Sequence, residues 1–514
     1  MWDLVNGGVD WACVVILVLG YFCTLFAEER VTRRAFQEGM GKVGERQGEA
    51  ELEMMRKTVD AMHSKGVETG RKFTPKAWRE LMAELGDQEH RPKWSICFGC
   101  VIDLSAFADS HPGGAHILGH FVGRDMTPWM VVTHAKTQRA LATLPALVVG
   151  LIDAPPDPLL SFSPALLAPV DQEYLRHVWE MANDGRLTYP LVWSIRDAFE
   201  VGIPLFVALL CIYRLGVLSL GIVFLGLGAT RAVYWAHDVL HGEATRTERE
   251  GVRLVWWVSM VLWGFDFAHF AIDHKVHHGF TNLIGLDKAA DVPFVPFHQI
   301  QVESGRNRGV GDTLRRMGVA NVLFFVCLSP LLATSYIVDG MRYRYVVKKQ
   351  SVWPWGVVEV LRLGSMFVFW EYQWPFLLAP ILASIAMGLI ATLNHPHQPM
   401  DLPQRFFSQE QAESTLHSFV ALQVSGNTNP GQSDSNLVHA LCGHFDLHIE
   451  HHLFPFLPRR RYGEIAQATR SWLLSHNLPY KAQPMVQAFV SFNQAMRCPH
   501  NRLTTSKTAS KPIQ

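Results

Sequence analysis

Three clusters of histidines, separated by long apolar stretches, constrain the fold of this 514-residue chain more than any other feature. In an α-helix, positions i, i+3 and i+4 lie on one face, so a His-x-x-His-His segment directs its three imidazoles to one point. Converging imidazoles are a metal-ligand arrangement, and clusters that share metals must lie on the same side of any membrane that the chain crosses. The clusters consist of His237 and His241; His274, His277 and His278; and His448, His451 and His452.

The composition favours an integral membrane protein over a soluble enzyme. Hydrophobic residues make up 49% of the chain, and the mean hydropathy is positive. Acidic and basic residues balance at 46 each, so we expect no nucleic-acid partner. The eight cysteines are scattered, which argues against a disulfide framework, and Cys97 and Cys100 are expected to flank a turn rather than to bind zinc.

The apolar runs predict an N-terminal membrane anchor and about four spanning helices. Residues 11–27 are expected to form the anchor, with a cleaved or interfacial segment as the alternative, and the basic residues that follow place the next segment in the cytosol. Residues 201–232 suit a helical hairpin with two short arms that turns near Arg214. Residues 254–270 are rich in Trp and Phe and are expected at the membrane interface.

Three further apolar runs separate the second histidine cluster from the third. Only an even number of crossings keeps all the clusters on one side, so two of these runs should span and one should lie in the interface. We expect the last two to span. The runs cover residues 321–338, 353–370 and 374–393.

Changes in composition divide the chain into five segments. A charged, partly helical linker follows the anchor, and a proline-rich stretch marks the boundary after a small soluble domain. We expect an amphipathic helix over residues 172–200 and another helix over residues 462–475. The segments are an anchor and linker (1–72), a small domain (73–153), a connector (154–200), a membrane domain (201–490) and a disordered tail (491–514).

A histidine motif in the small domain carries a specific resemblance. Residues 93–104 predict a strand, a turn and a strand; His111-Pro-Gly-Gly follows, and His134 lies 23 residues after His111. This set resembles the cytochrome b5 family, which implies an α+β domain that binds haem b with His111 and His134 as axial ligands. Ligation by two imidazoles leaves no site for oxygen, so such a haem transfers single electrons.

Three other residues of this domain are not expected to bind the haem. His116 and His120 lie between the two motif histidines, and we interpret them as surface or packing residues. Ile102 stands where the family commonly has tyrosine. We expect this difference to change packing rather than ligation.

Eight clustered imidazoles are too many for one metal ion. Neutral imidazole is a good ligand for iron, and an electron-delivering haem on the same chain favours a redox metal over zinc. Two non-haem irons with about four imidazoles each would leave coordination positions where dioxygen can bind.

The complete set of motifs resembles the front-end fatty acyl desaturases with a fused cytochrome b5, a family that includes sphingolipid delta-8 desaturases. The resemblance covers roughly residues 73–490 and depends on the order of the b5 motif, His-Asp-x-x-His, His-x-x-His-His and Ile-Glu-His-His-Leu-Phe-Pro. It implies an all-α, membrane-embedded diiron domain. The implied iron ligands are His237, His241, His274, His277, His278, His451 and His452.

Further residues have roles that depend on the same resemblance. His448 stands where front-end members usually have glutamine, although an imidazole can also ligate iron. His395 follows the last apolar run in an Asn-His that resembles the family's pattern, and it is a candidate ligand. Asp238 and Glu450 could orient ligating imidazoles. The histidines expected behind the ligands or on the surface are His269, His397, His439 and His444.

The resemblance implies an oxygen-dependent enzyme that introduces a cis double bond into the acyl chain of a membrane lipid or an acyl thioester. NADH-cytochrome b5 reductase would reduce the haem, which would reduce the irons. The implied location is the endoplasmic reticulum membrane, with the haem domain and the histidine clusters in the cytosol. The apolar tail of the substrate would lie in a tunnel that leads to the metals.

Three alternatives stay open at this stage. The substrate could be a sphingoid long-chain base, or the same scaffold could hydroxylate an acyl chain. A different class is a haem-binding electron-transfer membrane protein whose diiron site is inactive.

Overall fold

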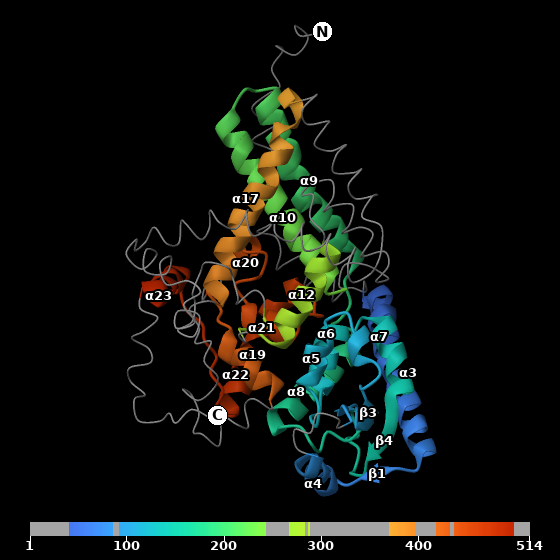
Figure 1. The fold of residues 1–514 in the computed structure, drawn as a ribbon. Coiled ribbons are helices and arrows are strands. Elements are labelled where there is room, and N and C mark those ends of the chain that lie inside the picture. The colour runs from blue at the N-terminus through green and yellow to red at the C-terminus, as the bar shows by residue number, and fades with distance from the viewer. Residues whose placement is uncertain are drawn as a thin grey trace.

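In the computed structural model, a small α+β part lies at one end of three long helices (Figure 1). Two short helices, α12 (Phe267–Gly279) and α21 (His448–Leu453), carry the second and third histidine clusters and lie between these two parts (Figure 1). The residues that the structure describes are 41–85, 92–242, 267–282, 286–287, 370–395, 418–431 and 436–497.

The α+β part contains a four-stranded sheet with the strand order β1-β4-β3-β2. β1 pairs with β4 in parallel, and the other two pairs are antiparallel. Helix α3 (Gly41–Thr69) packs against β4 and buries Met55, Val59 and Met62, so the predicted linker is partly helical as expected. The strands are β1 (Lys72–Phe73), β2 (Trp94–Cys97), β3 (Cys100–Asp103) and β4 (Val148–Ile152).

β2 and β3 form the predicted hairpin. Its two turn residues, Phe98 and Gly99, have φ values of 50° and 71°, the left-handed conformations that a type I′ turn requires. Cys97 and Cys100 pair across the turn and are completely buried, as is Ile102. The prediction of a strand, a turn and a strand is confirmed, and the two thiols belong to the hydrophobic core.

Short helices between β3 and β4 position the two histidines of the b5 motif. His111 directly follows the 3-10 helix η1 (Ala108–Ser110), and α6 (Thr127–His134) ends on His134. A proline in the first turn of α6 suits the helix start because that N–H has no intrahelical partner. The other helices between β3 and β4 are α5 (Ala115–Gly119), α7 (Gln138–Thr143) and the 3-10 helix η2 (Leu144–Leu147), and α4 (Pro75–Leu85) lies between β1 and β2.

The prediction of one amphipathic helix over residues 172–200 is wrong, because two helices share this stretch. α8 (Pro169–Asn183) ends before Gly185, whose φ of 68° is the conformation that commonly terminates helices. Pro190 then directly precedes α9 (Leu191–Tyr213). The glycine and the proline therefore break the periodic pattern.

α9 and α10 (Leu218–Leu240) form the predicted helical hairpin, with Arg214 as the C-cap of α9. Each helix has 23 residues, so the arms are longer than predicted. α9 extends beyond the apolar run because the charged residues of its first turns form buried ion pairs, including Asp197 and Glu200 with Arg460. α17 (Trp370–Asn394) contains the predicted run at 374–393 and lies beside α10 (Figure 1).

Among the described residues, α10 is the one helix that is long and apolar enough to cross a membrane. The count of four spanning helices therefore stays a prediction. The predicted anchor at 11–27 and the run at 321–338 lie outside the described residues, as do almost all of 353–370 and most of 254–270.

Five short α-helices lie in the described residues from 418 to 497. α22 has the bounds that the sequence predicts, whereas the predicted disorder of residues 491–497 is wrong because α23 continues to Arg497. Ala488 and Phe492 of α23 share one helical face, are completely buried and anchor the helix. The helices are α19 (Phe419–Gly426), α20 (Asn436–Leu441), α21 (His448–Leu453), α22 (Tyr462–Ser475) and α23 (Met485–Arg497).

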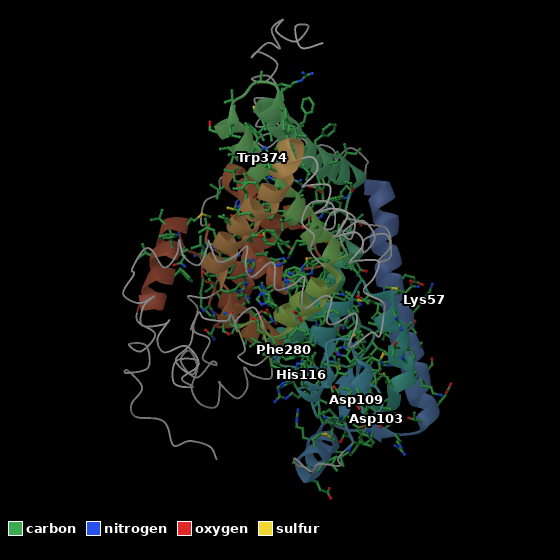
Figure 2. All side chains as sticks on the ribbon, turned by 45° about the horizontal axis from the view of Figure 1, so that its top comes forward. Lys57, Asp103, Asp109, His116, Phe280 and Trp374 are labelled. Atoms are coloured by element: carbon green, nitrogen blue, oxygen red, sulfur yellow. The ribbon has the colours of Figure 1, made fainter. Side chains whose placement is uncertain are left out.

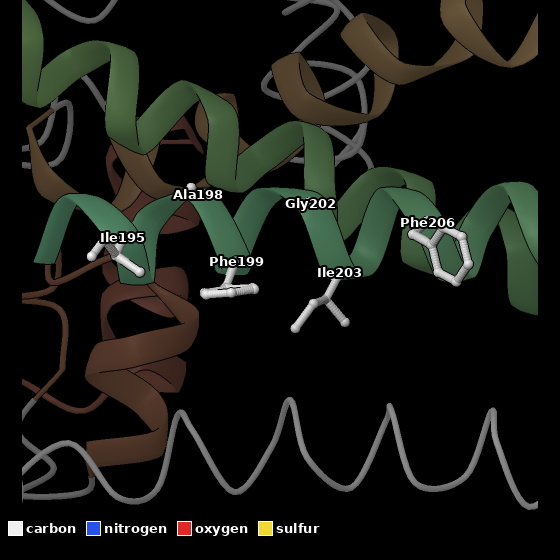
Figure 3. A pocket seen from close by; sticks show the side chains of 6 residues that line it. All are labelled: Ile195, Ala198, Phe199, Gly202, Ile203 and Phe206. Carbon is white, nitrogen blue, oxygen red and sulfur yellow. The ribbon is translucent and has the colours of Figure 1, made fainter. Parts of the chain in front are cut away.

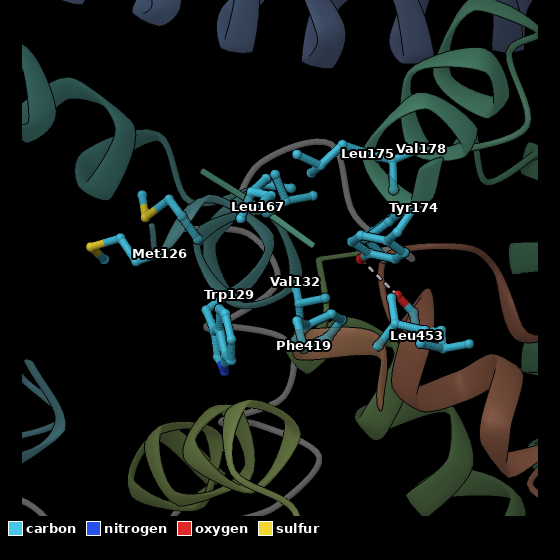
Figure 4. Close-up of a cluster of buried hydrophobic side chains, with 14 of the residues drawn as sticks. Met126, Trp129, Val132, Leu167, Tyr174, Leu175, Val178, Phe419 and Leu453 are labelled. Atoms are coloured by element: carbon cyan, nitrogen blue, oxygen red, sulfur yellow. Dashed lines mark hydrogen bonds between the residues drawn. The ribbon is translucent and has the colours of Figure 1, made fainter. Parts of the chain in front are cut away.

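One hydrophobic core joins the α+β part, α8 and the C-terminal helices (Figure 4). Trp129, Tyr174 and Phe419 pack together there, and the Tyr174 hydroxyl donates a hydrogen bond of 2.8 Å to the carbonyl of Leu453. Asp171 of α8 accepts hydrogen bonds from two backbone N–H groups at the start of α19, at 3.1 and 3.0 Å. α8 thus fixes the start of α19 and the end of α21 relative to the α+β part.

Candidate haem and metal sites

His111 and His134 face each other in the α+β part. Their ring centroids are 6.4 Å apart, and the ring planes are at 88° to each other. Nδ1 of each ring is buried and has no hydrogen-bond partner among the described residues. Two metal–imidazole bonds of about 2 Å each, together with the two ring radii, span a separation of this size. The pair therefore fits the axial ligation of one haem iron.

The two histidines between this pair lie on the surface. His116 and His120 are exposed, although the His120 ring centroid lies 5.7 Å from that of Phe280. This agrees with their interpretation as surface or packing residues.

Nine imidazoles converge in a second region, where the long helices meet the α+β part. α10 and its C-cap supply two of them, α12 (Phe267–Gly279) supplies three, the residue after α17 supplies one and α21 supplies three. The structure thus brings together all eight histidines of the predicted clusters, and His395 as well.

The nine imidazoles form two groups, each small enough to surround one ion. Five candidate ligand atoms lie within 4.8 Å of one another in the first group, and three do so in the second. His448 joins the second group because its Nε2 lies 2.6 Å from Nε2 of His395. The first group is His237, His241, His274, His278 and His451, and the second is His277, His395, His448 and His452.

The prediction that each His-x-x-His-His segment aims its rings at one point is wrong in detail. His274 and His278 lie in the first group, but His277 lies in the second; on α21 the i and i+4 rings lie in the second group and the i+3 ring in the first. Positions i and i+4 differ by about 40° around a helix, whereas i+3 and i+4 differ by about 100°. Each segment therefore contributes to both groups.

The ring nitrogens within the groups cannot all satisfy one another. Nε2 of His274 lies 2.7 Å from Nε2 of His237 and 3.1 Å from Nε2 of His241. Nε2 of His451 and Nε2 of His452 are buried without a hydrogen-bond partner among the described residues. A neutral imidazole carries only one N–H, so converging nitrogens of this kind present several lone pairs to one point and suit a shared cation. The donor set fits one metal ion in each group.

Burial keeps five rings on α12 and α21 in the form that binds metals. Burial, and then the neighbouring imidazoles, lower the pKa of His278, His448, His451 and His452 well below its usual range. The same causes lower the pKa of His274 to about 3. These groups are therefore unprotonated at neutral pH, as a ligating imidazole must be.

Polar partners hold the outer nitrogens of several rings. His277 Nδ1 donates to Asp287 Oδ2 at 2.8 Å, and Asp287 also accepts the backbone N–H of Asn282 at 2.8 Å. His452 Nδ1 lies 3.1 Å from Gln423 Oε1, and His451 Nδ1 lies 3.1 Å from the hydroxyl of Tyr462. With Nδ1 held, each ring can direct its Nε2 into its group.

Asp238 and Glu450 do not have the predicted orienting role. Asp238 Oδ2 lies 2.7 Å from Nη1 of Arg459, and Glu450 accepts hydrogen bonds from the Asn429 amide and the Tyr480 hydroxyl at 2.8 and 2.9 Å. Each acid is one residue from a histidine of the first group on its helix, so its side chain points about 100° away from that imidazole. The acids instead tie the ligand-bearing helices to other segments.

The four histidines expected behind the ligands or on the surface are outside both groups or outside the described side chains. His439 pairs with Asp446, and its ring stacks on that of His444 with the centroids 6.1 Å apart. The side chains of His269 and His397 lie outside the described part of the chain.

An apolar groove of about 510 Å³ lies along α9 (Figure 3). Phe199 and Phe206 are 60% and 58% exposed there. The groove suits contact with other apolar groups and offers no titratable side chain for chemistry. It is lined by Ile195, Ala198, Phe199, Gly202, Ile203 and Phe206.

Comparison with known proteins identifies both parts of the chain. The family described as "Fatty acid desaturase" matches residues 215–484, a segment that contains both imidazole groups. This chain belongs to the fatty acid desaturases. The "Cytochrome b5-like Heme/Steroid binding domain" matches residues 77–153, which include His111 and His134. The prediction of a fatty acyl desaturase with a fused cytochrome b5 domain is confirmed.

Several desaturases are similar to this one over most of their length. Fatty acid desaturase 3 of Homo sapiens is 25% identical over 82% of this chain and 92% of its own. Delta(5) fatty acid desaturase fat-4 of Caenorhabditis elegans is 22% identical over 79% of this chain and 95% of its own. Acyl-lipid 8-desaturase of Rebecca salina is 22% identical over 79% of this chain and 91% of its own. No solved structure matches this desaturase.

Replacing Asp287 with asparagine should weaken the desaturase without unfolding it. Burial alone would raise the pKa of Asp287, but the His277 contact and the hydrogen bonds hold it below the usual range, so the carboxylate is charged. An amide is a weaker acceptor for the His277 N–H, and we expect about a 10- to 100-fold loss of turnover or metal affinity. Product formation and iron content measure the effect. The exposed Asp153→Asn variant is the control, and equal activity of the two variants would contradict an orienting role.

Proposed function

We propose that this chain is a front-end acyl desaturase with one b-type haem and two non-haem irons. His111 and His134 would hold the haem, and the two imidazole groups would each hold one iron, with His395 and His448 among the ligands. The observation that carries this proposal is the packing of nine buried or half-buried imidazoles into two groups next to a haem-type histidine pair.

The residues of the two groups fit the chemistry of a desaturase. When bound, two irons supply dioxygen activation, so that two hydrogens leave adjacent methylenes and, with two electrons and two protons, dioxygen becomes two waters. The nine imidazoles would hold the metals without adding negative charge, and the carboxylate of Asp287 would orient the His277 ring. NADH-cytochrome b5 reductase would supply the electrons one at a time through the haem.

The substrate would be an unsaturated acyl chain on a lipid or a thioester. The similar proteins named as a delta-5 and an acyl-lipid 8-desaturase support a new double bond near the carboxyl end. The cis configuration is part of the proposal and is read from the product. We place α9, α10 and α17 in the endoplasmic reticulum membrane, with the histidine groups and the haem domain on its cytosolic side.

The deciding experiment is expression in a yeast that lacks polyunsaturated lipids, with a panel of unsaturated fatty acids supplied. Mass spectrometry that localises double bonds should find a new one between the carboxyl end and an existing double bond. Hydroxylated chains or altered sphingoid bases would instead show that the proposed reaction or substrate is wrong. Cells without the gene are the control.

The His448→Gln variant should keep part of the activity. Front-end desaturases usually have glutamine at this position, and its amide oxygen can approach the metal of the second group from the same helical position. We expect about a tenfold loss, against no detectable product for His448→Ala. The assay is product formation per haem. An inactive His448→Gln enzyme with normal haem would show that this site requires the imidazole.

A further inference from the structure

Trp129 joins the haem domain to the helix that carries three of the metal-site histidines. Its indole Nε1–H donates a hydrogen bond of 2.8 Å to the carbonyl of Gly279, and the side chain is only 8% exposed. Trp129 lies on α6, the helix that ends on His134. Gly279 directly follows His278, a member of the first imidazole group. One side chain therefore links the helix of a haem histidine to the residue after a metal-site histidine.

Aromatic rings surround this contact. Trp129 meets Phe121 and Phe419 edge to face, each with the ring centroids 5.4 Å apart, and Figure 4 shows Trp129 close to Phe419. Phe280 packs on Phe121 at 5.6 Å and marks the boundary between the two parts in Figure 2. Phe280 is 6% exposed, so the contact excludes water. A dry, close-packed contact holds an electron donor and an acceptor at a fixed separation.

The peptide segment at the end of α12 is also held from the metal side. Gln423 of α19 donates a hydrogen bond of 2.7 Å to the carbonyl of His278, and its Oε1 lies 3.1 Å from Nδ1 of His452. Bonds to Trp129 and Gln423 thus fix two consecutive carbonyls. The position of the His278 ring relative to the haem domain is set by these bonds.

We propose that Trp129 is the residue that couples the haem electronically to the non-haem irons, through its hydrogen bond to Gly279 and then His278. This inference rests on the proposed function. In each transfer the haem iron goes from ferrous to ferric, and one ferric non-haem iron becomes ferrous; NADH and its reductase then restore the ferrous haem. No proton crosses the contact, because the indole N–H stays bonded to the carbonyl oxygen.

A second hydrogen bond between the haem domain and α12 makes it possible to distinguish an effect on electron transfer from an effect on the docking of the two parts. Lys275 Nζ of α12 donates to Thr137 Oγ1 of the haem domain at 3.1 Å. Replacing Trp129 with phenylalanine keeps an aromatic ring in the core and leaves this bond in place. The substitution therefore removes the Nε1–H donor without separating the two parts.

The test compares Trp129→Phe with Trp78→Phe in the full-length enzyme with haem and iron bound. Trp78 is a matched control because it is 1% exposed and its Nε1–H also donates to a glycine carbonyl, that of Gly123 at 3.2 Å, but within the haem domain. The main measurement is the rate at which the prereduced haem is reoxidised after mixing with oxygen and an acyl substrate. The haem spectrum, the iron content and the rate of limited proteolysis between the two parts report folding, metal binding and docking.

We expect reoxidation in Trp129→Phe to be at least about tenfold slower than in the wild type, as is usual for changes one contact behind a metal ligand. The other three measurements should not change, and Trp78→Phe should match the wild type. Reoxidation of Trp129→Phe at the wild-type rate would overturn the inference and leave the proposed function standing. Slower reoxidation with faster proteolysis would also overturn it, because Trp129 would then serve docking alone. A wild-type haem whose reoxidation does not respond to substrate would overturn the proposed function itself.

Discussion

Replacing His451 with alanine should abolish desaturation and remove non-haem iron, while the haem absorption spectrum stays unchanged. His451 is 1% exposed, and its Nε2 lies in the first group without a hydrogen-bond partner among the described residues. We expect activity to fall by more than about 100-fold, beyond the range usual for residues that only support a ligand. Product mass spectrometry and the ratio of iron to haem measure the two effects. The haem should remain because His111 and His134 lie in a different part of the chain.

His476→Ala is the matched control for this substitution. His476 is the C-cap of α22, and its Nε2 lies 2.8 Å from a carboxylate oxygen of Glu173, outside both imidazole groups. This variant should keep the activity and the iron content of the wild type. An active His451→Ala enzyme would refute the assignment of His451 as an iron ligand.

Local periodicity predicted the parts of the site but not their arrangement. The spacing of His274, His277 and His278 placed three rings on one helical face, which is a property of neighbouring residues. The division of these rings between two groups depends on α10, on α21 and on His395, which meet them only in the folded chain. No spacing along the sequence reports such contacts.

The residues that hold the imidazoles could not be predicted from sequence spacing either. Asp238 is adjacent to His237 in the sequence, yet it pairs with Arg459, whereas Asp287 contacts His277 from ten residues away. Gln423 belongs to no motif and still contacts His452. Adjacent helical positions point in different directions, so an acid next to a ligand is a poor candidate to orient it.

The boundaries of the elements were predictable where a single strong signal marks them. α22 and the β2–β3 hairpin follow from periodicity and from the Phe98-Gly99 turn. The stretch from 172 to 200 has an amphipathic pattern on both sides of Gly185. This continuous pattern predicts one helix, although the glycine ends α8. The docking of the haem domain on α12 through Trp129 left no trace in local sequence, because its two partners are 150 residues apart.

Removal of the haem alone tests whether the fused domain supplies the electrons for desaturation. Trp129, Lys275 and the α8 contacts fix the domain on the helices that carry the imidazoles. A haem that is part of this assembly should be the obligatory donor. Loss of the haem should then stop turnover even though the metal groups are complete.

Replacing His111 with alanine should abolish haem incorporation and turnover while non-haem iron is retained. The ring of His111 faces that of His134 at 6.4 Å, and a single remaining imidazole cannot supply both axial ligands. The measurements are the haem absorption spectrum, iron per protein and product formation in cells. His116→Ala is the control, because His116 is exposed and lies on α5, shortly after His111 in the same domain, and it should keep both haem and activity. Desaturation by His111→Ala in cells that contain free cytochrome b5 would mean that a second protein can reach the metal groups, and that the fused domain is dispensable.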